Sequence, residues 1–340
     1  MKRAVCSAVV LSLAVLLSGA LQLTGAQDKI VWRLGYLSVP KSGYQAMIDA
    51  LPDRLGKLTG GRLEIQTSAT IVAPLQHLAA LRDGRLEAVA AVLPYYSGEA
   101  PVLNVGGLPG LFQSFEEYTK ATDTFLFEAY DKIYREKYNG VHLAHGNWPG
   151  QVIFSKQPIR TLADFKGTKI RAHNLETSQL MAKLGAKPIA MPFAEFFPAI
   201  QRGVVDAGMT GTTPGFGIGL YQVTKYINDW RIGYTVAWSV IVNTKTWDSL
   251  PADLKPKLVA EFKKIQAEYA AAVGEETKKG LDLNREKGME VINPDPAELA
   301  KSRDPKLLRE IWDGWIDLNK KQGFDGKSLL DGVQKVLKQS

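Results

Sequence analysis

Residues 159–171 read IRTLADFKGTKIR. Thr161 with Asp164 three positions later is the pattern of a capping box, which predicts a short helix that begins at Thr161. Gly167 predicts the end of this helix, and the Lys-Ile-Arg run after it predicts a strand that leads into Arg171. A helix, a glycine stop and a strand in immediate succession are typical of an α/β fold.

The same alternation of helices and strands extends over the rest of the chain. Apolar residues at helical spacing predict helices at 42–58, 75–86, 177–184 and 194–201. Alternating or continuous apolar runs predict strands at 30–35, 63–67, 88–93, 188–191 and 204–209. Strands separated by helix-sized segments favour parallel α/β sheets over an all-β sandwich, and 340 residues are enough for two domains.

Three amphipathic stripes near the C-terminus predict longer helices. From Leu254 to Val273 the apolar residues are spaced by 4, 4, 3, 4 and 4 positions, which predicts a helix from residue 251 past residue 279. Two further stripes lie within residues 308–316 and 329–337. These helices complete the expectation of a two-domain α/β protein.

The N-terminus has the three parts of a secretory signal peptide. A basic start at Lys2 and Arg3 precedes an apolar run over residues 4–23, and small residues up to Ala26 offer a cleavage site. We therefore expect residues 1–26 to be a signal peptide that is cleaved near Ala26, and the mature protein to be periplasmic. A membrane anchor is the alternative, because about 20 apolar residues can span a bilayer.

Composition excludes several classes of protein. The net charge of +7 could suggest nucleic acid, but basic and acidic residues are interleaved without a block of five like charges, so we expect no nucleic-acid partner. Cys6, the only cysteine, lies in the expected signal peptide, which leaves no thiol for a disulfide or a thiolate metal site.

Motifs of common enzymes are missing from the sequence. There is no G-x-S-x-G elbow, no P-loop and no H-E-x-x-H, and no two of the four histidines are spaced i, i+4 as a helical zinc site requires. The glycine-rich run at 215–219 does not lead from a strand into a helix. We expect it to be a flexible surface loop rather than a dinucleotide-binding loop.

Arg171 is the one charged residue whose place in the pattern points to a ligand. Ligands of open α/β sheets bind outside the strand ends, and a guanidinium there can hold a carboxylate through two hydrogen bonds while it stays charged. The alternative is that Arg171 is a solvated surface cation.

The motifs around Arg171 resemble those of TRAP-transporter solute-binding proteins, the secreted receptors of tripartite ATP-independent importers. Residues 159–171 are similar to the family block I-x-T-x-x-D-x-K-G-x-K-I-R, and residues 199–206, AIQRGVVD, to A-L-Q-x-G-V-V-D. Further similarities, among them 58–63, 80–86 and 184–188, extend over nearly the whole mature chain in order.

This resemblance implies a two-lobed periplasmic binding protein fold of type II-like arrangement, with hinge strands and a long helix that spans both lobes. We expect the first lobe to consist of residues 27–150 and 239–285. The second lobe would consist of residues 151–238 and 286–340. The ligand cleft would lie between the two.

The resemblance also implies what the site binds. In this family the arginine that ends the K-I-R element pairs with the ligand's carboxylate, so Arg171 is the expected primary contact. Many members have a second arginine where this chain has Gln151, and an asparagine where it has Thr210. Because neither replacement carries a charge, we expect a monocarboxylate rather than a dicarboxylate, unless another cation such as Lys41 substitutes. No carboxylate lies near Met209 and Thr210, so we expect no metal and no cofactor.

Four aromatic residues are candidates for the rest of the pocket. Trp148 precedes Gln151 at the expected crossing between lobes, and Trp238 lies near the expected return crossing. Tyr95 ends a strand of the first lobe, and Phe193 begins a helix of the second. Each could equally be a core residue, because aromatic side chains dominate protein cores.

The sequence therefore predicts a receptor that closes over a small organic acid and delivers it to the membrane permease subunits of a TRAP importer. A secreted α/β enzyme that acts on an organic acid is an alternative, with Asp206, Glu195 or His173 as the candidate general base. A ligand-sensing receptor for a membrane signalling protein is a third possibility, since it would use the same pocket.

Overall fold

The computed structural model describes residues 29–233 and 236–339, whose strands form two separate sheets. The first sheet has the order β2-β1-β3-β10-β4 and contains Leu63–Ser68, Ile30–Tyr36, Ala88–Val92, Ala237–Asn243 and Gly140–Asn147. The second has the order β11-β9-β5-β8-β6-β7 and contains Glu290–Ile292, Tyr226–Gly233, Gln151–Ser155, Ala207–Gly211, Lys169–Ala172 and Lys187–Ala190. The strands joined by helices pair in parallel, whereas β5 and β10 pair antiparallel with their neighbours.

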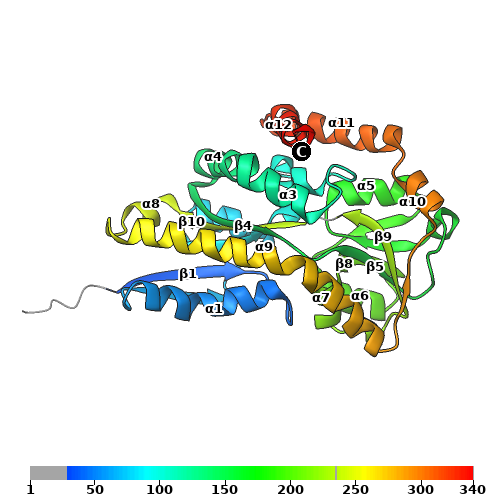
Figure 1. Cartoon of the computed structure of the whole chain (residues 1–340), viewed down its shortest axis with the longest axis horizontal. Coiled ribbons are helices and arrows are strands. Elements are labelled where there is room, and N and C mark those ends of the chain that lie inside the picture. Colours follow the sequence, from blue (N-terminus) through cyan, green and yellow to red (C-terminus); the bar gives the residue numbers. More distant parts are fainter. Residues whose placement is uncertain (1–28, 234–235, 340) are drawn as a thin grey trace, which may run out of the picture.

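The chain passes between the two sheets through short connections. Residues 148–150 lead from β4 of the first sheet to β5 of the second, and β9 leads back to β10. The backbone N–H of Trp148 donates to the carbonyl oxygen of Val236 (2.7 Å), so the two crossings are hydrogen-bonded to each other. Helix α9, Leu254–Glu286, extends from the first lobe across to the second (Figure 1). The two-lobed α/β fold with hinge strands and a long helix is thus confirmed.

Both sheets are mixed, and helices cover both faces of each. In the first lobe these are α1 to α4, α8 and part of α9, and in the second α5 to α7 and α10. Their bounds are Gly43–Leu58, His77–Arg82, Phe115–Ala121, Phe127–Tyr138 and Thr244–Asp248 in the first lobe, and Leu175–Lys183, Phe193–Gln201, Thr212–Gly217 and Pro296–Ser302 in the second. The short turns used below are η2 (Leu93–Tyr96), η3 (Pro101–Gly107) and η5 (Leu162–Phe165).

Local signals in the sequence place the elements that carry the site. The capping box forms as predicted: the backbone N–H of Thr161 donates to the Asp164 carboxylate (2.8 Å) at the start of η5. Gly167 then adopts a φ of 76°, in the left-handed region that glycine tolerates. The chain leaves this turn directly into β6, which ends just beyond Arg171.

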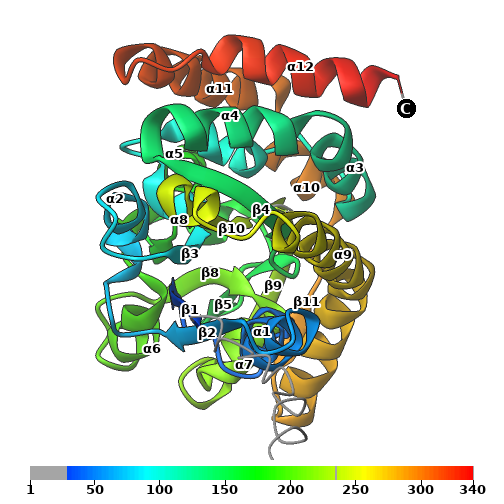
Figure 2. The ribbon, with the colours of Figure 1, turned by 90° about the vertical axis from the view of Figure 1, so that its left-hand side faces the viewer.

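The C-terminal helices differ from the sequence-based expectation. Helix α12, Gly326–Lys338, buries Leu329, Leu330 and Val333 in the same hydrophobic cluster as Tyr118 and Tyr130 of the first lobe. With α11, Pro305–Lys321, it lies over α3 and α4 (Figure 2). This packing differs from the expectation that all of 286–340 belongs to the second lobe, because an amphipathic stripe does not specify the surface that it covers.

The glycine-rich run at 215–219 is also not a flexible loop. Its first part belongs to α7, which packs against α9. Gly215 is buried, and a Cβ there would lie 2.4 Å from the ring of Phe154. The glycines allow this close packing, which their spacing alone did not indicate.

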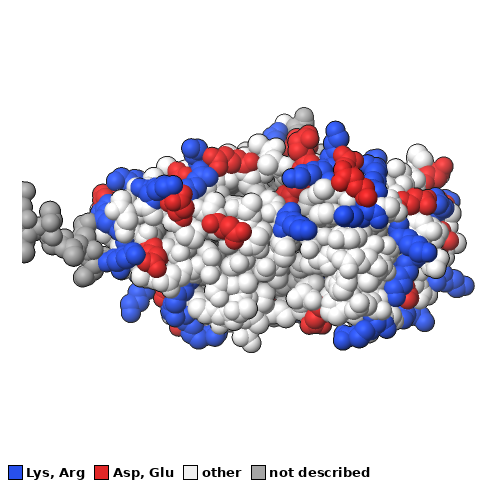
Figure 3. Space-filling model, turned by 90° about the horizontal axis from the view of Figure 1, so that it is seen from below, with Lys and Arg blue, Asp and Glu red and all other residues white. Residues whose placement is uncertain are grey.

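Charges of both signs lie interspersed on the face shown in Figure 3, with uncharged residues over much of its centre. Within the described ranges, no helix is both long and apolar enough to cross a membrane. The expected signal peptide lies outside the described residues.

Candidate functional site

A cavity lies between the lobes, beside the two crossings. We call it the Arg171 compartment. The first lobe and the crossings contribute Leu37, Val39, Val92, Pro94, Tyr95, Trp148 and Val236, and the second lobe contributes Gln151, Arg171, His173, Phe193, Thr210, Gly211 and Pro214. Six of the seven predicted ligand-binding residues therefore line one cavity.

Arg171 is the only arginine or lysine among the residues lining this compartment, and it is 2% exposed. Strand β6 places it between Ile189 of β7 and Gly208 of β8. Its Nε donates to the carbonyl oxygen of Met191 (3.2 Å), and its Nη1 donates to that of Met209. These two bonds fix the guanidinium and leave Nη2 without a hydrogen bond to any described residue.

The packing around Arg171 requires a glycine at position 208. A Cβ on Gly208 would lie 2.8 Å from the Cβ of Arg171 and 2.3 Å from the ring of Phe196. The guanidinium carbon lies 5.5 Å from the centre of that ring, within cation–π distance. The side chain is thus held by two carbonyls, an aromatic face and the neighbouring strand.

The charge of Arg171 is buried without a carboxylate partner among the described residues, since none of their ion pairs includes it. Burial lowers the pKa of its guanidinium below the ordinary value, yet arginine remains charged in proteins. A buried charge is costly unless it is paired. The arrangement therefore favours an anion in the compartment.

Gln151 and Thr210, the two uncharged candidates, both line the compartment and are 6% and 5% exposed. Gln151 begins β5 and donates from Nε2 to the carbonyl oxygen of Pro149 (2.8 Å). Thr210 lies on β8 opposite Val152. Both side chains can form hydrogen bonds, but neither supplies a positive charge.

Three aromatic candidates also line the compartment, and two of them join the lobes. The backbone N–H of Phe193, at the start of α6, donates to the hydroxyl of Tyr95 on η2 (2.9 Å). Trp148 packs its ring 4.5 Å from that of Tyr44. Its Nε1 is buried and has no partner among the described residues.

Trp238, unlike the other six candidates, is not among the residues lining the compartment. It is fully buried in the core of the first lobe, with its ring 5.0 Å from that of Tyr269. The return crossing ends before Ala237, and Trp238 is already paired with Val92 and Gly146 in the first sheet. The crossing thus lies closer to the N-terminus than the sequence suggested.

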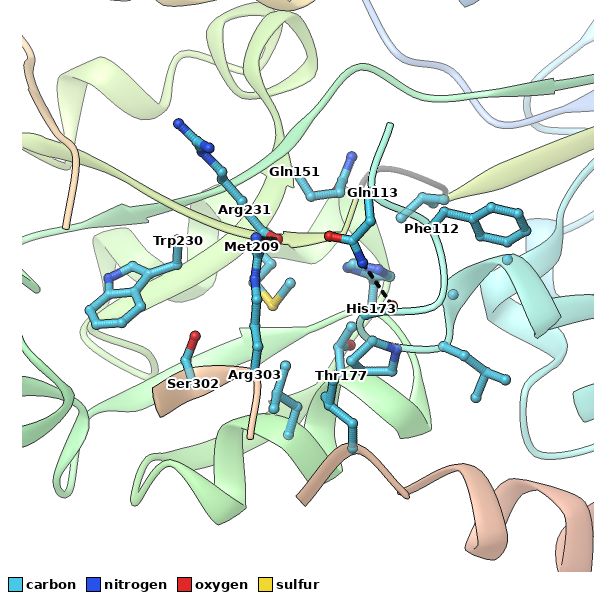
Figure 4. A pocket seen from close by; sticks show the side chains of 18 residues that line it. Phe112, Gln113, Gln151, His173, Thr177, Met209, Trp230, Arg231, Ser302 and Arg303 are labelled. Carbon is cyan, nitrogen blue, oxygen red and sulfur yellow. Dashed lines mark hydrogen bonds between the residues drawn. The ribbon is translucent and has the colours of Figure 1, made fainter. Parts of the chain in front are cut away.

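His173, which the sequence indicates only as a candidate base, lines the Arg171 compartment. It also lines a second cavity next to it, the Arg303 compartment, together with Gln151 and Val236 (Figure 4). This second cavity includes Gln113, Thr177, Met209, Arg231 and Arg303. The two compartments therefore share a wall made of Gln151, His173 and Val236.

The strand ends of the first lobe supply wall residues that were not predicted. Leu37 and Val39 follow β1, and Pro94 follows β3. The rule that ligands bind outside strand ends points to these residues as well as to Arg171.

The remaining charged candidates lie elsewhere. Asp206 accepts a hydrogen bond from the backbone N–H of Lys169 (3.2 Å) and is partly exposed, and Glu195 is exposed on α6. Lys41 extends over the ring of Phe216, 5.1 Å from its centre. None of the three is among the residues lining the Arg171 compartment.

Among residues 29–233 and 236–339, no three His, Cys, Asp or Glu side chains are grouped so that they could hold a metal ion.

Two α/β lobes that are joined by hinge strands and enclose a buried arginine define a two-lobed solute-binding protein. The family model for bacterial extracellular solute-binding proteins, family 7 (DctP), matches residues 38–314. The chain therefore belongs to this family, that of the TRAP-transporter solute-binding proteins, and the resemblance seen in its sequence is confirmed.

Relatives and solved structures support the family and the fold. A solute-binding protein of Albidiferax ferrireducens is 30% identical over 62% of this chain and 63% of its own length. The 2,3-diketo-L-gulonate-binding periplasmic protein of Escherichia coli is 25% identical over 89% and 92%. The pyroglutamic acid receptor DctP7 of Bordetella pertussis superposes with a TM-score of 0.79 at 24% identity, over 89% of this chain and 99% of that chain.

Proposed function

We propose that this chain is the extracytoplasmic receptor of a TRAP importer and captures a small organic acid with a single carboxylate. Arg171 pairs with the carboxylate, the lobes close over the acid, and the receptor delivers it to the membrane permease subunits. One observation carries the proposal. The guanidinium of Arg171 is buried in a cavity that both lobes line, and it has no carboxylate partner among the described residues.

The number of charges in the compartment favours one carboxylate. By the resemblance to the family, Gln151 and Thr210 take the places of an arginine and an asparagine that many members have. The other residues lining the compartment include no second lysine or arginine. A second carboxylate in the same compartment would be buried without a countercharge, which is unfavourable. Aromatic and aliphatic side chains form most of the remaining wall and suit an apolar body.

Named ligands of similar proteins are small carboxylic acids. They include pyroglutamic acid for the Bordetella pertussis receptor and orotic acid for a Desulfovibrio salexigens protein, whose structure is 22% identical with a TM-score of 0.82 over 91% of this chain and 98% of that chain. Each of these acids has one carboxylate, whereas the succinate bound by a Sulfurospirillum deleyianum protein has two. The choice between a monocarboxylate and a dicarboxylate therefore rests on the side chains that line the compartment in this chain.

Energetics explains why binding requires both lobes. A micromolar Kd corresponds to about −8 kcal/mol, and a hydrogen bond to a charged group contributes roughly 1.5–3 kcal/mol. Arg171 alone is therefore insufficient, and burial of the acid between the lobes must supply the rest. The acid would act by binding the closed arrangement more tightly than the open one.

A thermal-shift screen of residues 27–340 against carboxylic acids tests this function. At 100 times its Kd, a true ligand stabilises the protein by about 2.7 kcal/mol, which raises Tm by several degrees. We expect the largest shifts from monocarboxylates, and we expect NMR to recover the bound acid chemically unchanged. Larger shifts with matched dicarboxylates would contradict the single-carboxylate assignment, and no shift with any acid would contradict the function.

A buried carboxyl group at the lobe interface makes binding depend on pH. Glu176, at the start of α5, is 1% exposed and accepts a hydrogen bond from the side chain of Asn104 on η3 of the first lobe (2.7 Å). Burial is the main cause that raises the pKa of Glu176 from its ordinary 4.5 to about 7, while the hydrogen bond from Asn104 opposes the shift. Opening of the lobes would return this carboxyl group to water.

Closure therefore takes up a proton between pH 4.5 and 7. The contribution of Glu176 to the free energy of closure is fully favourable below pH 4.5. It declines as pH rises through this window and is constant above it. We expect the Kd for the acid from the screen to rise about tenfold between pH 5.5 and 7.5 in titration calorimetry. Glu176→Gln should remove most of this rise, whereas Glu195→Gln, on an exposed part of α6, should retain it. An equal rise in Glu176→Gln would exclude Glu176 as its origin.

A further inference from the structure

We propose that His173 is a specificity-determining residue, and that the bound acid carries an uncharged hydrogen-bonding group, such as a hydroxyl, oxo or amide, which His173 recognises. This inference rests on the proposed function, because it assumes that Arg171 holds the carboxylate. It adds a second polar contact and narrows the class of ligand.

The backbone places His173 next to Arg171 on the same side of the chain. Arg171 lies in β6, and His173 follows two positions later, just past the end of the strand. Side chains at i and i+2 of an extended chain point to the same face. Both residues accordingly line the Arg171 compartment, and the charge of Arg171 is close enough to influence the pKa of the imidazole.

His173 is an exception among the four histidines. His77 and His142 each bond one ring nitrogen to a backbone carbonyl (3.2 Å in both cases), and His145 bonds both ring nitrogens. The residue His173 keeps some exposed surface, yet both of its ring nitrogens are buried and have no partner among the described residues. Buried polar atoms are almost always hydrogen-bonded, so a bound molecule is the natural partner here.

The charge state of His173 decides what kind of group it recognises. Burial, and secondarily the charge of Arg171, lower the pKa of the imidazole to about 3. A neutral imidazole offers one N–H donor and one acceptor nitrogen. It therefore suits a hydroxyl, oxo or amide group and supplies no countercharge for a second carboxylate.

The wall shared by the two compartments supports the same assignment. Gln151 lies in that wall with His173, and its Nε2 is held by the carbonyl oxygen of Pro149. The wall thus presents two uncharged side chains to a molecule bound at Arg171. The other two arginines near this wall, Arg231 and Arg303, line the Arg303 compartment on its far side, where Nη2 of Arg303 donates to the carbonyl oxygen of Arg231 (2.8 Å).

Matched pairs of acids test the role of His173. The pairs are lactate and propionate, mandelate and phenylacetate, and pyroglutamate and cyclopentanecarboxylate, titrated calorimetrically into wild type, His173→Ala and His173→Gln. For at least one pair, we expect wild type to bind the polar acid about tenfold or more tightly than its apolar partner. His173→Ala should reduce this ratio to below about threefold, and His173→Gln, which keeps a donor and an acceptor, should retain most of it.

Two controls separate this inference from the proposed function. Gln113→Ala changes an exposed side chain that lines only the Arg303 compartment and should leave the ratio unchanged. Circular dichroism checks the fold of each variant.

If wild type binds an acid through Arg171 but shows no preference within any pair, or if His173→Ala keeps the preference, the role of His173 is wrong. A preference for a dicarboxylate that depends on Arg303 also overturns it. If wild type binds no acid, the proposed function fails as well.

Where binding to His173→Ala is too weak to measure, the ratio in His173→Gln decides. Retention of the preference supports recognition by a neutral donor and acceptor, and its loss contradicts it.

Discussion

Truncation of Arg171 to alanine is expected to weaken binding of the acid by about a hundredfold or more. The variant loses charge-assisted hydrogen bonds and leaves the ligand's carboxylate buried without a countercharge. Arg171→Lys keeps the charge but not the planar fork, so its affinity should lie between those of wild type and Arg171→Ala. Titration calorimetry with the acid from the screen measures both.

The control for this prediction is an arginine of the neighbouring cavity. Arg303 lines the Arg303 compartment but not the Arg171 compartment, so Arg303→Ala should change the Kd by less than about threefold. Because Arg171 also bonds the carbonyls of Met191 and Met209, the Tm of each ligand-free variant must be recorded. Unchanged affinity in a folded Arg171→Ala protein would remove Arg171 from the site.

A methyl group at Gly217 is expected to weaken binding by about tenfold to a hundredfold without contacting the ligand. Gly217 ends α7 of the second lobe, and a Cβ there would lie 2.0 Å from the carbonyl oxygen of Pro40 in the first lobe. This oxygen is backbone and cannot rotate away as a side chain could. Gly217→Ala should therefore hold the lobes apart and oppose closure.

The lobe contact predicts a particular pattern of effects for Gly217→Ala. Affinity should fall by a similar factor for every acid that binds, while the Tm of the ligand-free protein changes little, because open lobes relieve the clash. Gly274→Ala on α9, where a Cβ meets nothing within 4 Å, is the matched control and should bind normally. Wild-type affinity in Gly217→Ala would show that closure does not bring these two lobes into this contact.

Much of the fold could be predicted because its signals are local. The capping box at Thr161 and Asp164, and the glycine stop at Gly167, act within a few residues and fix where β6 begins. The apolar spacing from Leu254 predicted a helix that the structure extends to Glu286. Such patterns identify elements, and the family motifs then supplied their arrangement.

What could not be predicted depends on contacts between distant elements. The sequence places Trp238 near the return crossing but does not fix the residue at which the next strand begins, and β10 begins before Trp238. The stripe of α12 identified a buried face but not the lobe that buries it. The unpartnered nitrogens of His173 are visible only once the surrounding side chains are placed.

A crystal structure of the protein saturated with the acid from the thermal-shift screen is the most direct test. We predict one carboxylate within hydrogen-bonding distance of the Arg171 guanidinium, with both lobes in contact around the ligand. Electron density for the acid at any other place, or lobes that stay apart while it is bound, would contradict this account.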